Sequence, residues 1–324
     1  MNGRWIRALL LAPLLGLMGQ AAPPPTTAPP LDPNESAVVQ QLEIVVVGRR
    51  PGPALWTVKR GDAEVVVLGG LSPLPHMLQW DTQRVERAMD GARLVILPPT
   101  GRVGVLDALY LVFHAGELRL PGGQSLWERL TPEQRRRFDN LRLQIKADPK
   151  KYERLKPAIA AFALLGDFEK AAGLSSAKPG STVKALAEAH HVPTRSSGGV
   201  QVSQLFKTVV RMDPAAEQAC TDAALAETER AASMARPLAE AWAKGDLRTV
   251  RAGDRPTGID QCLAGSGLQG FIDKQIRDST ASIDTALSQG GKTFAVVDLR
   301  LLLNANGVLD RLKAEGAEIT VPPP

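Results

Sequence analysis

The sequence is poor in the residues that mark several common protein classes. Cys220 and Cys262 are its two cysteines, so it has no Cys-x-x-Cys motif and can form at most one internal disulfide. It also contains no Gly-x-Ser-x-Gly turn, no His-Glu-x-x-His pair and no phosphate-binding Walker loop. The sequence therefore gives no sign of a dithiol redox protein, a serine hydrolase, a zinc protease or a P-loop nucleotide hydrolase.

Long apolar runs are also scarce, and the one that stands out lies at the start. Arg4 and Arg7 precede the apolar stretch Ala8–Met18, and Gly19–Ala22 supplies small residues for cleavage. This order is typical of a secretory signal peptide, here residues 1–22, because the apolar stretch is too short to cross a bilayer comfortably. An uncleaved membrane anchor is the alternative.

Two further absences bear on location. No cysteine stands near the cleavage point, which argues against a bacterial lipoprotein, and no later segment has the length and apolarity of a transmembrane helix. We therefore expect a periplasmic or secreted protein without a membrane span after cleavage.

Residues 23–42 begin with the proline-rich run Pro23–Pro30 and predict an extended linker. The remaining residues, 43–324, predict the folded domain.

Charge of one sign is not concentrated anywhere in the sequence. The formal net charge is +5, and it is smaller once Arg4 and Arg7 are removed. Basic residues are scattered among acidic ones, and the densest basic run, Arg135–Arg137, is typical of a solvated helix face. The composition therefore does not support a nucleic-acid-binding surface, and the sequence identifies no partner.

Near the start of the domain the pattern predicts a parallel β-α-β unit. Glu64–Leu68 is a β-branched run bounded by glycines, which indicates a buried strand. Asp81 or Thr82 can cap a helix that extends through Ala92. A second strand, Arg93–Leu97, is stopped by Pro98 and Pro99.

The rest of the chain predicts helices followed by strands. Thr131 with Pro132 and Asp213 with Pro214 mark helix starts, the second helix running to Gly245 with a break at Pro237. A third helix covers Leu268–Leu287. The C-terminal segments predict a strand, a helix and a strand at Thr293–Val297, Val308–Glu315 and Glu318–Val321. The fold class is α/β, with a sheet built from strands near both termini and a central helical region covering it.

Three runs of the sequence resemble one protein family. They are residues 53–80 (PALWTVKRGDAEVVVLGGLSPLPHMLQW), Trp242–Leu247 and Phe294–Ile319. They are similar to the TraB/GumN family of metal-dependent hydrolases, which includes the Tiki proteases, and the resemblance extends from about Ala54 to Val321. The resemblance implies that the two β-rich ends share a sheet. It also implies a cleft in which histidines of two Gly-x-x-His motifs hold a metal.

The polar residues of the family motifs are replaced in this sequence. The first Gly-x-x-His motif falls on Gly69 to Ser72, and the second falls on Val297 to Arg300. A family glutamate falls at Leu97 or Pro98, and a later one falls near Ser197. The family's Arg-Asn pair falls on Arg277 and Asp278, so its arginine is retained.

These replacements remove the chemistry that a metal requires. A divalent metal is bound by deprotonated His, Asp or Glu side chains. Ser72 is a weak donor, Arg300 has no lone pair to give, and Leu97 or Pro98 supplies neither ligand nor base. We therefore expect no cofactor. The alternative is a divalent metal on an incomplete site made by His76 and, after a slip in register, Asp298.

The sequence leaves three functional hypotheses. The first is a non-catalytic relative that keeps the family cleft as a binding or scaffold surface, with Arg277 and Arg300 as candidate ligands for a carboxylate or phosphate. The second is a peptidase-like hydrolase with altered ligands, using His76, Asp298 or Arg277. The third is a purely structural envelope protein.

The two cysteines permit one bridge in an exported chain. We expect Cys220 and Cys262 to pair if their helices pack together, and two free buried thiols are the alternative.

Overall fold

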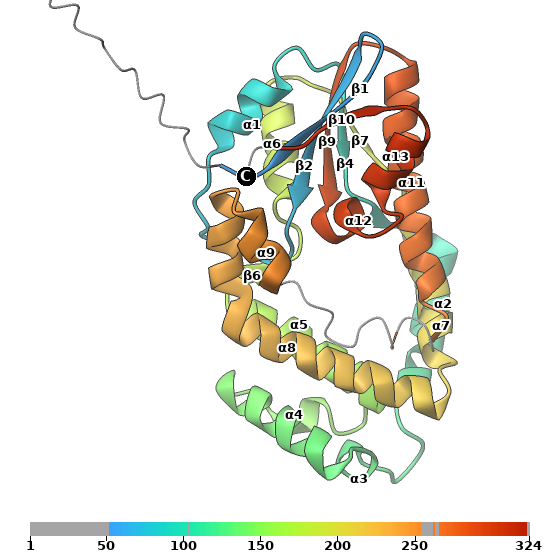
Figure 1. Cartoon of the computed structure of the whole chain (residues 1–324). Helices are drawn as coiled ribbons and strands as arrows, with labels where there is room; N and C mark the ends of the chain where they lie inside the picture. The colour runs from blue at the N-terminus through green and yellow to red at the C-terminus, as the bar shows by residue number, and fades with distance from the viewer. Residues whose placement is uncertain (1–51, 103, 254–261, 263–265, 323–324) are drawn as a thin grey trace, which may run out of the picture. The chain divides into compact units, whose positions relative to one another are not determined.

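A computed structural model describes residues 52–102, 104–253, 262 and 266–322 (Figure 1). Its central feature is a six-stranded sheet in the order β10-β1-β2-β9-β4-β7. The strands are β1 (Leu55–Arg60), β2 (Ala63–Gly70), β4 (Val95–Leu97), β7 (Thr194–Ser196), β9 (Lys292–Asp298) and β10 (Glu318–Thr320). The proposed signal peptide and linker, residues 1–42, lie outside the described residues.

The sheet joins the two ends of the domain, as predicted. β2 and β9 are parallel neighbours, with Val67 opposite Ala295. β4 is parallel to both β9 and β7, whereas β1 runs antiparallel to β2 and β10. β2 and β4 are therefore parallel, as predicted, but the predicted pairing of the two strands is wrong, because β9 lies between them.

Residue type explains why β2 and β9 form the centre of the sheet. Both strands are almost continuously apolar and buried along their length, which is typical of parallel strands covered on both faces. α11 (Gln269–Ser288) contacts β1, β2 and β9, while α1 (Thr82–Met89) contacts β9 and α6 (Gly180–Ala189) contacts β4. Figure 1 shows α1 and α6 on one side of the sheet and α11 with α13 (Val308–Ala314) on the other.

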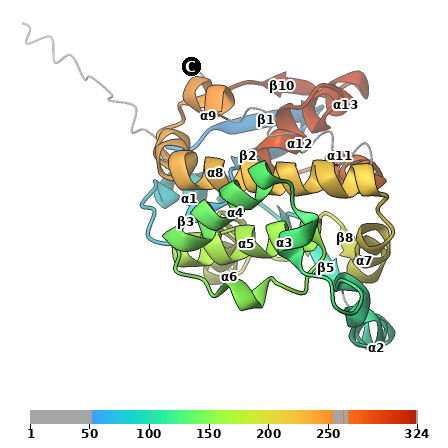
Figure 2. The same cartoon turned by 90° about the horizontal axis from the view of Figure 1, so that it is seen from below.

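The central part of the chain is helical. Its helices include α3 (Leu126–Arg129), α4 (Pro132–Gln144), α5 (Pro157–Ala171) and α8 (Pro214–Ala243). α5 and α8 run side by side in Figures 1 and 2, and the arrowheads of β2 and β9 point toward them. The helical region therefore lies beyond the carboxyl ends of the parallel strands.

The two helix starts predicted from proline dipeptides are confirmed, but the predicted break is wrong. Thr131 and Gln134 form a reciprocal capping box at the start of α4, and the carboxylate of Asp213 accepts a hydrogen bond from Ala216 N at the start of α8. α8 continues through Pro237 as one helix of 30 residues. A proline removes one backbone hydrogen bond, but the chain stays helical on both sides of Pro237, and Ala235 before it and Leu238 after it are both buried.

Smaller elements complete the fold. They are β3 (Leu74–Pro75) paired with β6 (Leu174–Ser175), β5 (Thr100–Arg102) paired with β8 (Gly199–Gln201), α2 (Val105–His114), α7 (Val202–Val210), α9 (Leu247–Gly253), α12 (Leu299–Leu303) and the short 3-10 turns Ala115–Leu118 and Pro149–Lys151. α2 packs against α7, and Figure 2 shows this pair displaced from α5 and α8. Among the described residues no helix is long and apolar enough to span a membrane.

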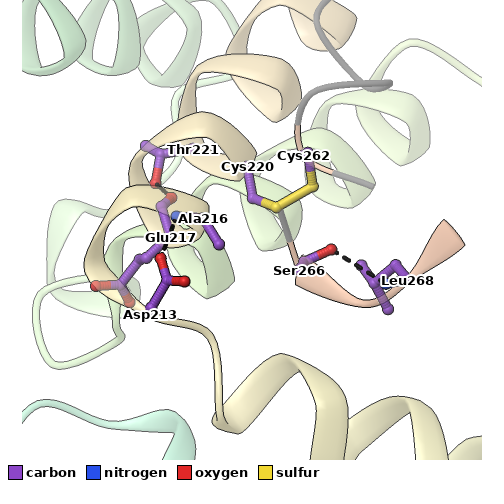
Figure 3. Close-up of a disulfide and its surroundings, with 8 residues drawn as sticks. All are labelled: Asp213, Ala216, Glu217, Cys220, Thr221, Cys262, Ser266 and Leu268. Atoms are coloured by element: carbon purple, nitrogen blue, oxygen red, sulfur yellow. Dashed lines mark hydrogen bonds between the residues drawn. A yellow bond between two sulfur atoms is a disulfide. The ribbon is translucent and has the colours of Figure 1, made fainter. Parts of the chain in front are cut away.

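A disulfide joins Cys220 and Cys262, which confirms the predicted pair (Figure 3). Cys220 lies in the second turn of α8, and its Cα is 4.4 Å from that of Cys262. Both cysteines are fully buried. The bridge closes a loop of 42 residues, so it ties Cys262 to the start of α8.

Candidate functional site

A cavity of about 380 Å³ lies at the carboxyl ends of the parallel strands. This is the edge at which open α/β sheets commonly bind ligands. Four strands (β2, β4, β5 and β9), the start of α6 and one side of α11 contribute to its wall. The lining residues include Gly70, Ser72, Leu97, Pro98, Thr100, Ser176, Lys178, Gly180, Ser181, Lys184, Gln275, Asp298 and Leu301.

The end of β2 is shaped by close packing. A Cβ atom at Gly69 would lie 2.5 Å from Leu299 Cδ1 and 2.7 Å from Trp56 Cζ3, so a larger residue does not fit there. The carbonyl of Gly69 accepts a hydrogen bond of 2.7 Å from Trp242 Nε1. The chain then turns into the cavity at Gly70. The glycine at position 69 is therefore required by the close packing of Leu299 and Trp56 around it.

Ser72 follows β2 and lines the cavity, but its hydroxyl is engaged. Ser72 Oγ donates to the carbonyl of Ser176 at 3.1 Å, and Ser176 Oγ donates to Glu169 of α5 at 3.1 Å. Burial raises the pKa of Glu169; the Ser176 hydrogen bond acts in the opposite direction and nearby Glu227 reinforces the rise. A polar chain therefore runs from the end of β2 to the helical region.

The end of β9 brings a carboxylate to the cavity and turns an arginine away from it. Asp298 lines the cavity and caps α12, its carboxylate accepting a hydrogen bond of 2.9 Å from Arg300 N. The guanidinium of Arg300 lies 3.8 Å from the carboxylate of Glu227 on α8, which also pairs with Arg230. Arg300 is not among the residues that line the cavity.

The end of β4 is apolar. Leu97 and Pro98 line the cavity, and the next strand, β7, leads to Ser197, which is 7% exposed. The carbonyl of Ser197 accepts a hydrogen bond of 3.0 Å from Ser282 of α11. Neither β4 nor β7 therefore places a carboxylate at this edge of the sheet.

The family that the motifs suggested is confirmed by comparison with known families. The model of the TraB/PrgY/gumN family matches residues 54–321. The chain belongs to this family. No curated protein and no solved structure gives a match. The match covers the sheet, the helical region and the cavity between them.

The structure brings together part of the TraB/PrgY/gumN motif set predicted from the sequence. Ser72, Leu97 with Pro98, and Asp298 all line the same cavity. The motif positions that the resemblance singled out at the ends of β2, β4 and β9 therefore meet at one cavity. Its residues differ in kind from metal ligands, since only Asp298 among the lining residues carries a carboxylate and none is a histidine.

The family's metal does not fit the residues that are described here. No three His, Cys, Asp or Glu side chains converge in the described part of the chain. His76 is not a lining residue, and its carbonyl accepts a hydrogen bond of 2.5 Å from Lys178 Nζ. Asp298 is already used as a helix cap. A divalent cation requires several such donors at one point, and the cavity does not supply them.

The candidate anion pair, Arg277 and Arg300, is not brought together. Arg277 lines a separate depression of about 480 Å³ with Arg60 and Arg311. Helix geometry explains why Arg277 does not reach the cavity at the strand ends. Residues two apart on a helix point in different directions, and on α11 it is Gln275 that faces this cavity. Within the described residues these two arginines line no common cavity.

The positive groups that do face the cavity were missed by the sequence analysis. Lys178 and Lys184 flank the first turn of α6, and Gly180 and Ser181 of that turn also line the cavity. The first N–H groups of a helix lack intrahelical partners and carry partial positive charge. Two lysines near a proline could have drawn attention, but nothing local showed that the segment meets β2 and β9.

Proposed function

We propose that this protein is an exported, non-catalytic member of the TraB/PrgY/gumN family that binds a small anionic molecule in the cavity at the strand ends. One observation carries the proposal. The cavity occupies the edge of the sheet where the family motifs fall, yet its charged lining consists of Lys178, Lys184 and Asp298. The site is open to a ligand and lacks a set of metal ligands.

The charges of the lining favour an anion over a cation. Two lysines and one carboxylate line the cavity, and that carboxylate already accepts a hydrogen bond from the backbone of α12. Lys178 uses one of the three donors of its ammonium on the carbonyl of His76 and keeps two for a ligand. The partial positive charge at the start of α6 also favours an anion, while the N–H of Ser181 itself donates to the carbonyl of Ala177 at 3.0 Å. Ser181 and Gln275 can supply further hydrogen bonds. A compact carboxylate or phosphate ester matches this set of donors.

Export is supported by independent features of the chain. The first 22 residues have the order of a signal peptide, and a Cys220–Cys262 disulfide is compatible with an oxidising compartment. We propose that the mature protein works in the periplasm or outside the cell. Sequencing the N-terminus of the purified protein tests this, with a chain that still begins at Met1 counting against export.

Calorimetric titration with inorganic phosphate and succinate tests the binding proposal. We expect the wild-type protein to bind at least one of these probes and the Lys178→Gln/Lys184→Gln variant to bind it at least tenfold more weakly. Arg277→Gln is the matched control, because this arginine lines a different depression. Equal loss in the control, or unchanged binding in the lysine variant, would count against the cavity as the site.

A metal titration tests the competing hydrolase hypothesis with the same protein. Zinc, manganese and cobalt are added separately, and His76→Ala and Asp298→Asn are the variants. Stoichiometric binding that either substitution abolishes would favour a metal-dependent hydrolase over the binding protein. We expect no such binding, because the lining supplies one carboxylate and no histidine.

A further inference from the structure

α2 carries an apolar stripe on its exposed side. The stripe consists of Val105, Leu106, Leu109, Val112 and Phe113, which are between 49% and 81% exposed. Eight large apolar side chains are this exposed in the described part of the chain, and five of them belong to the α2 stripe. Single exposed apolar residues are ordinary, whereas a contiguous group marks an interaction surface.

The positions of these residues place them on one side of the helix. Their spacing follows the helical repeat, so all five lie within one broad face of α2. The opposite face is already packed on α7. There the Tyr110 ring lies 6.1 Å from the Phe206 ring, Lys207 Nζ is 4.6 Å from the Tyr110 ring, and Asp107 hydrogen-bonds to Ser203. The stripe is therefore an outer surface of an anchored helix.

We propose that the α2 stripe is the interface through which two copies of this chain form a symmetric dimer. Full burial of five such side chains removes roughly 600 Å² per copy, or about 1,200 Å² in total, which reaches the lower end of stable protein interfaces. A two-fold axis across the stripe makes the two α2 helices antiparallel. In that arrangement the partial positive start of each helix lies beside the partial negative end of the other.

The composition of α2 distinguishes a second copy from a membrane surface. Helices that lie on membranes usually carry lysine and arginine on the face opposite their apolar side. α2 contains neither residue, and its one acidic side chain, Asp107, faces α7. The composition of α2 therefore favours contact with the α2 stripe of a second copy over contact with an anionic lipid surface.

Sedimentation equilibrium of the protein purified from an exporting host tests the dimer. We expect the wild type to dimerise with a Kd in the micromolar range and the Leu106→Lys/Phe113→Lys variant to raise that Kd at least fiftyfold. Leu143→Lys is the matched control, since Leu143 is 60% exposed on α4 and lies outside the stripe. A wild-type protein that stays monomeric at 100 μM, or a stripe variant that still dimerises, overturns the proposal.

A crosslinking experiment tests the geometry without disturbing the fold. Leu109 lies at the middle of the stripe, and in an antiparallel pair it approaches the two-fold axis. Because both native cysteines are bonded to each other, Leu109→Cys adds a single reactive thiol. We expect mild oxidation to convert this variant into a covalent dimer and to leave Leu143→Cys monomeric.

Two further results would overturn the proposal. Equal crosslinking of Leu109→Cys and Leu143→Cys would show that collisions, not an interface, join the chains. Flotation with phosphatidylglycerol vesicles that depends on Leu106 and Phe113 would assign the stripe to a lipid surface.

Discussion

The sheet and the helical region of this protein are held together in different ways. The sheet is enclosed by one continuous apolar core that runs from Trp56 in β1 to Leu312 in α13. The helical region has three smaller apolar clusters, the largest of them centred on Phe138, Tyr152 and Leu164. It adds a disulfide and several polar contacts between helices, including Arg137 with Glu229. A small apolar core is thus supplemented by bonds of other kinds, as in other domains with limited burial.

α8 connects the two regions. Its C-terminal end contributes Leu238 and Trp242 to the core of the sheet, whereas its N-terminal half contributes Leu225 to the helical core and Cys220 to the disulfide. Substitutions at the two ends of α8 therefore test separately how the sheet and the helical region are stabilised.

The largest effect is expected at the sheet end of α8. Trp242 is 1% exposed and donates a hydrogen bond to the carbonyl of Gly69. Trp242→Ala removes a large buried side chain and should lower the free energy of unfolding by about 3–5 kcal/mol, measured by urea denaturation. Trp242→Phe keeps much of the volume but leaves the Gly69 carbonyl unpaired, so we expect a loss of about 1–3 kcal/mol. Equal losses in the two variants would show that volume is unimportant there.

The next effect is expected at the other end of α8. Replacing both cysteines (Cys220→Ala/Cys262→Ala) opens the loop of 42 residues and should cost about 2–4 kcal/mol. Hydrogen exchange should quicken in α5 and in the first half of α8, while β2 and β9 keep their protection. If exchange quickens equally in the sheet and in the helical region, the disulfide does not stabilise the helical region in particular.

The smallest effect concerns a polar contact within the helical region. Tyr152 is fully buried, and its hydroxyl donates a hydrogen bond of 2.5 Å to Asp167. Burial raises the pKa of the Tyr152 phenol, so it stays protonated and remains a donor. Tyr152→Phe should lower the free energy of unfolding by about 1–2 kcal/mol at neutral pH. If the free energy of unfolding does not change, the Tyr152–Asp167 hydrogen bond is no stronger than the hydrogen bonds that the two groups make to water in the unfolded chain.

The same contact predicts how stability depends on pH. Burial disfavours ionisation of Asp167, but hydrogen bonds from Lys151 and Tyr152 outweigh it and lower the pKa of Asp167 below its ordinary value of 3.8. A lowered pKa contributes stability that is present above the unfolded value and is lost as pH falls through the folded one. Below about pH 4, wild-type stability should therefore fall more steeply than that of Tyr152→Phe. Parallel curves for the two proteins would contradict this coupling.

Much of the fold was predictable because its signals are local. The apolar runs of β2 and β9 and the caps at Thr131 and Asp213 can be read from short segments. The break predicted at Pro237 was wrong because α8 stays helical beyond it, where Leu238 and Trp242 pack in the core of the sheet against residues distant in sequence. The position of β9 between β2 and β4 is likewise a long-range pairing that no local pattern reveals.

The meeting of the motif positions at one cavity was predictable, but the charged residues that line this candidate site were not. The family resemblance placed Ser72, Leu97 and Asp298 at one edge of the sheet, and the structure brings them together. It also favoured Arg277 and Arg300, whose side chains lie elsewhere. Side-chain direction on a helix and the approach of a distant segment such as that of Lys178 depend on the whole fold, so motif spacing could not supply them.

The disulfide also changes the topology of the molecule. Any backbone cut between residues 220 and 262 leaves the two fragments linked, because Cys220 and Cys262 lie on opposite sides of the cut. A protease that nicks α9 would therefore produce a molecule that migrates as one chain until a reductant is added. In an environment that contains proteases, such a nicked molecule would keep its fragments together.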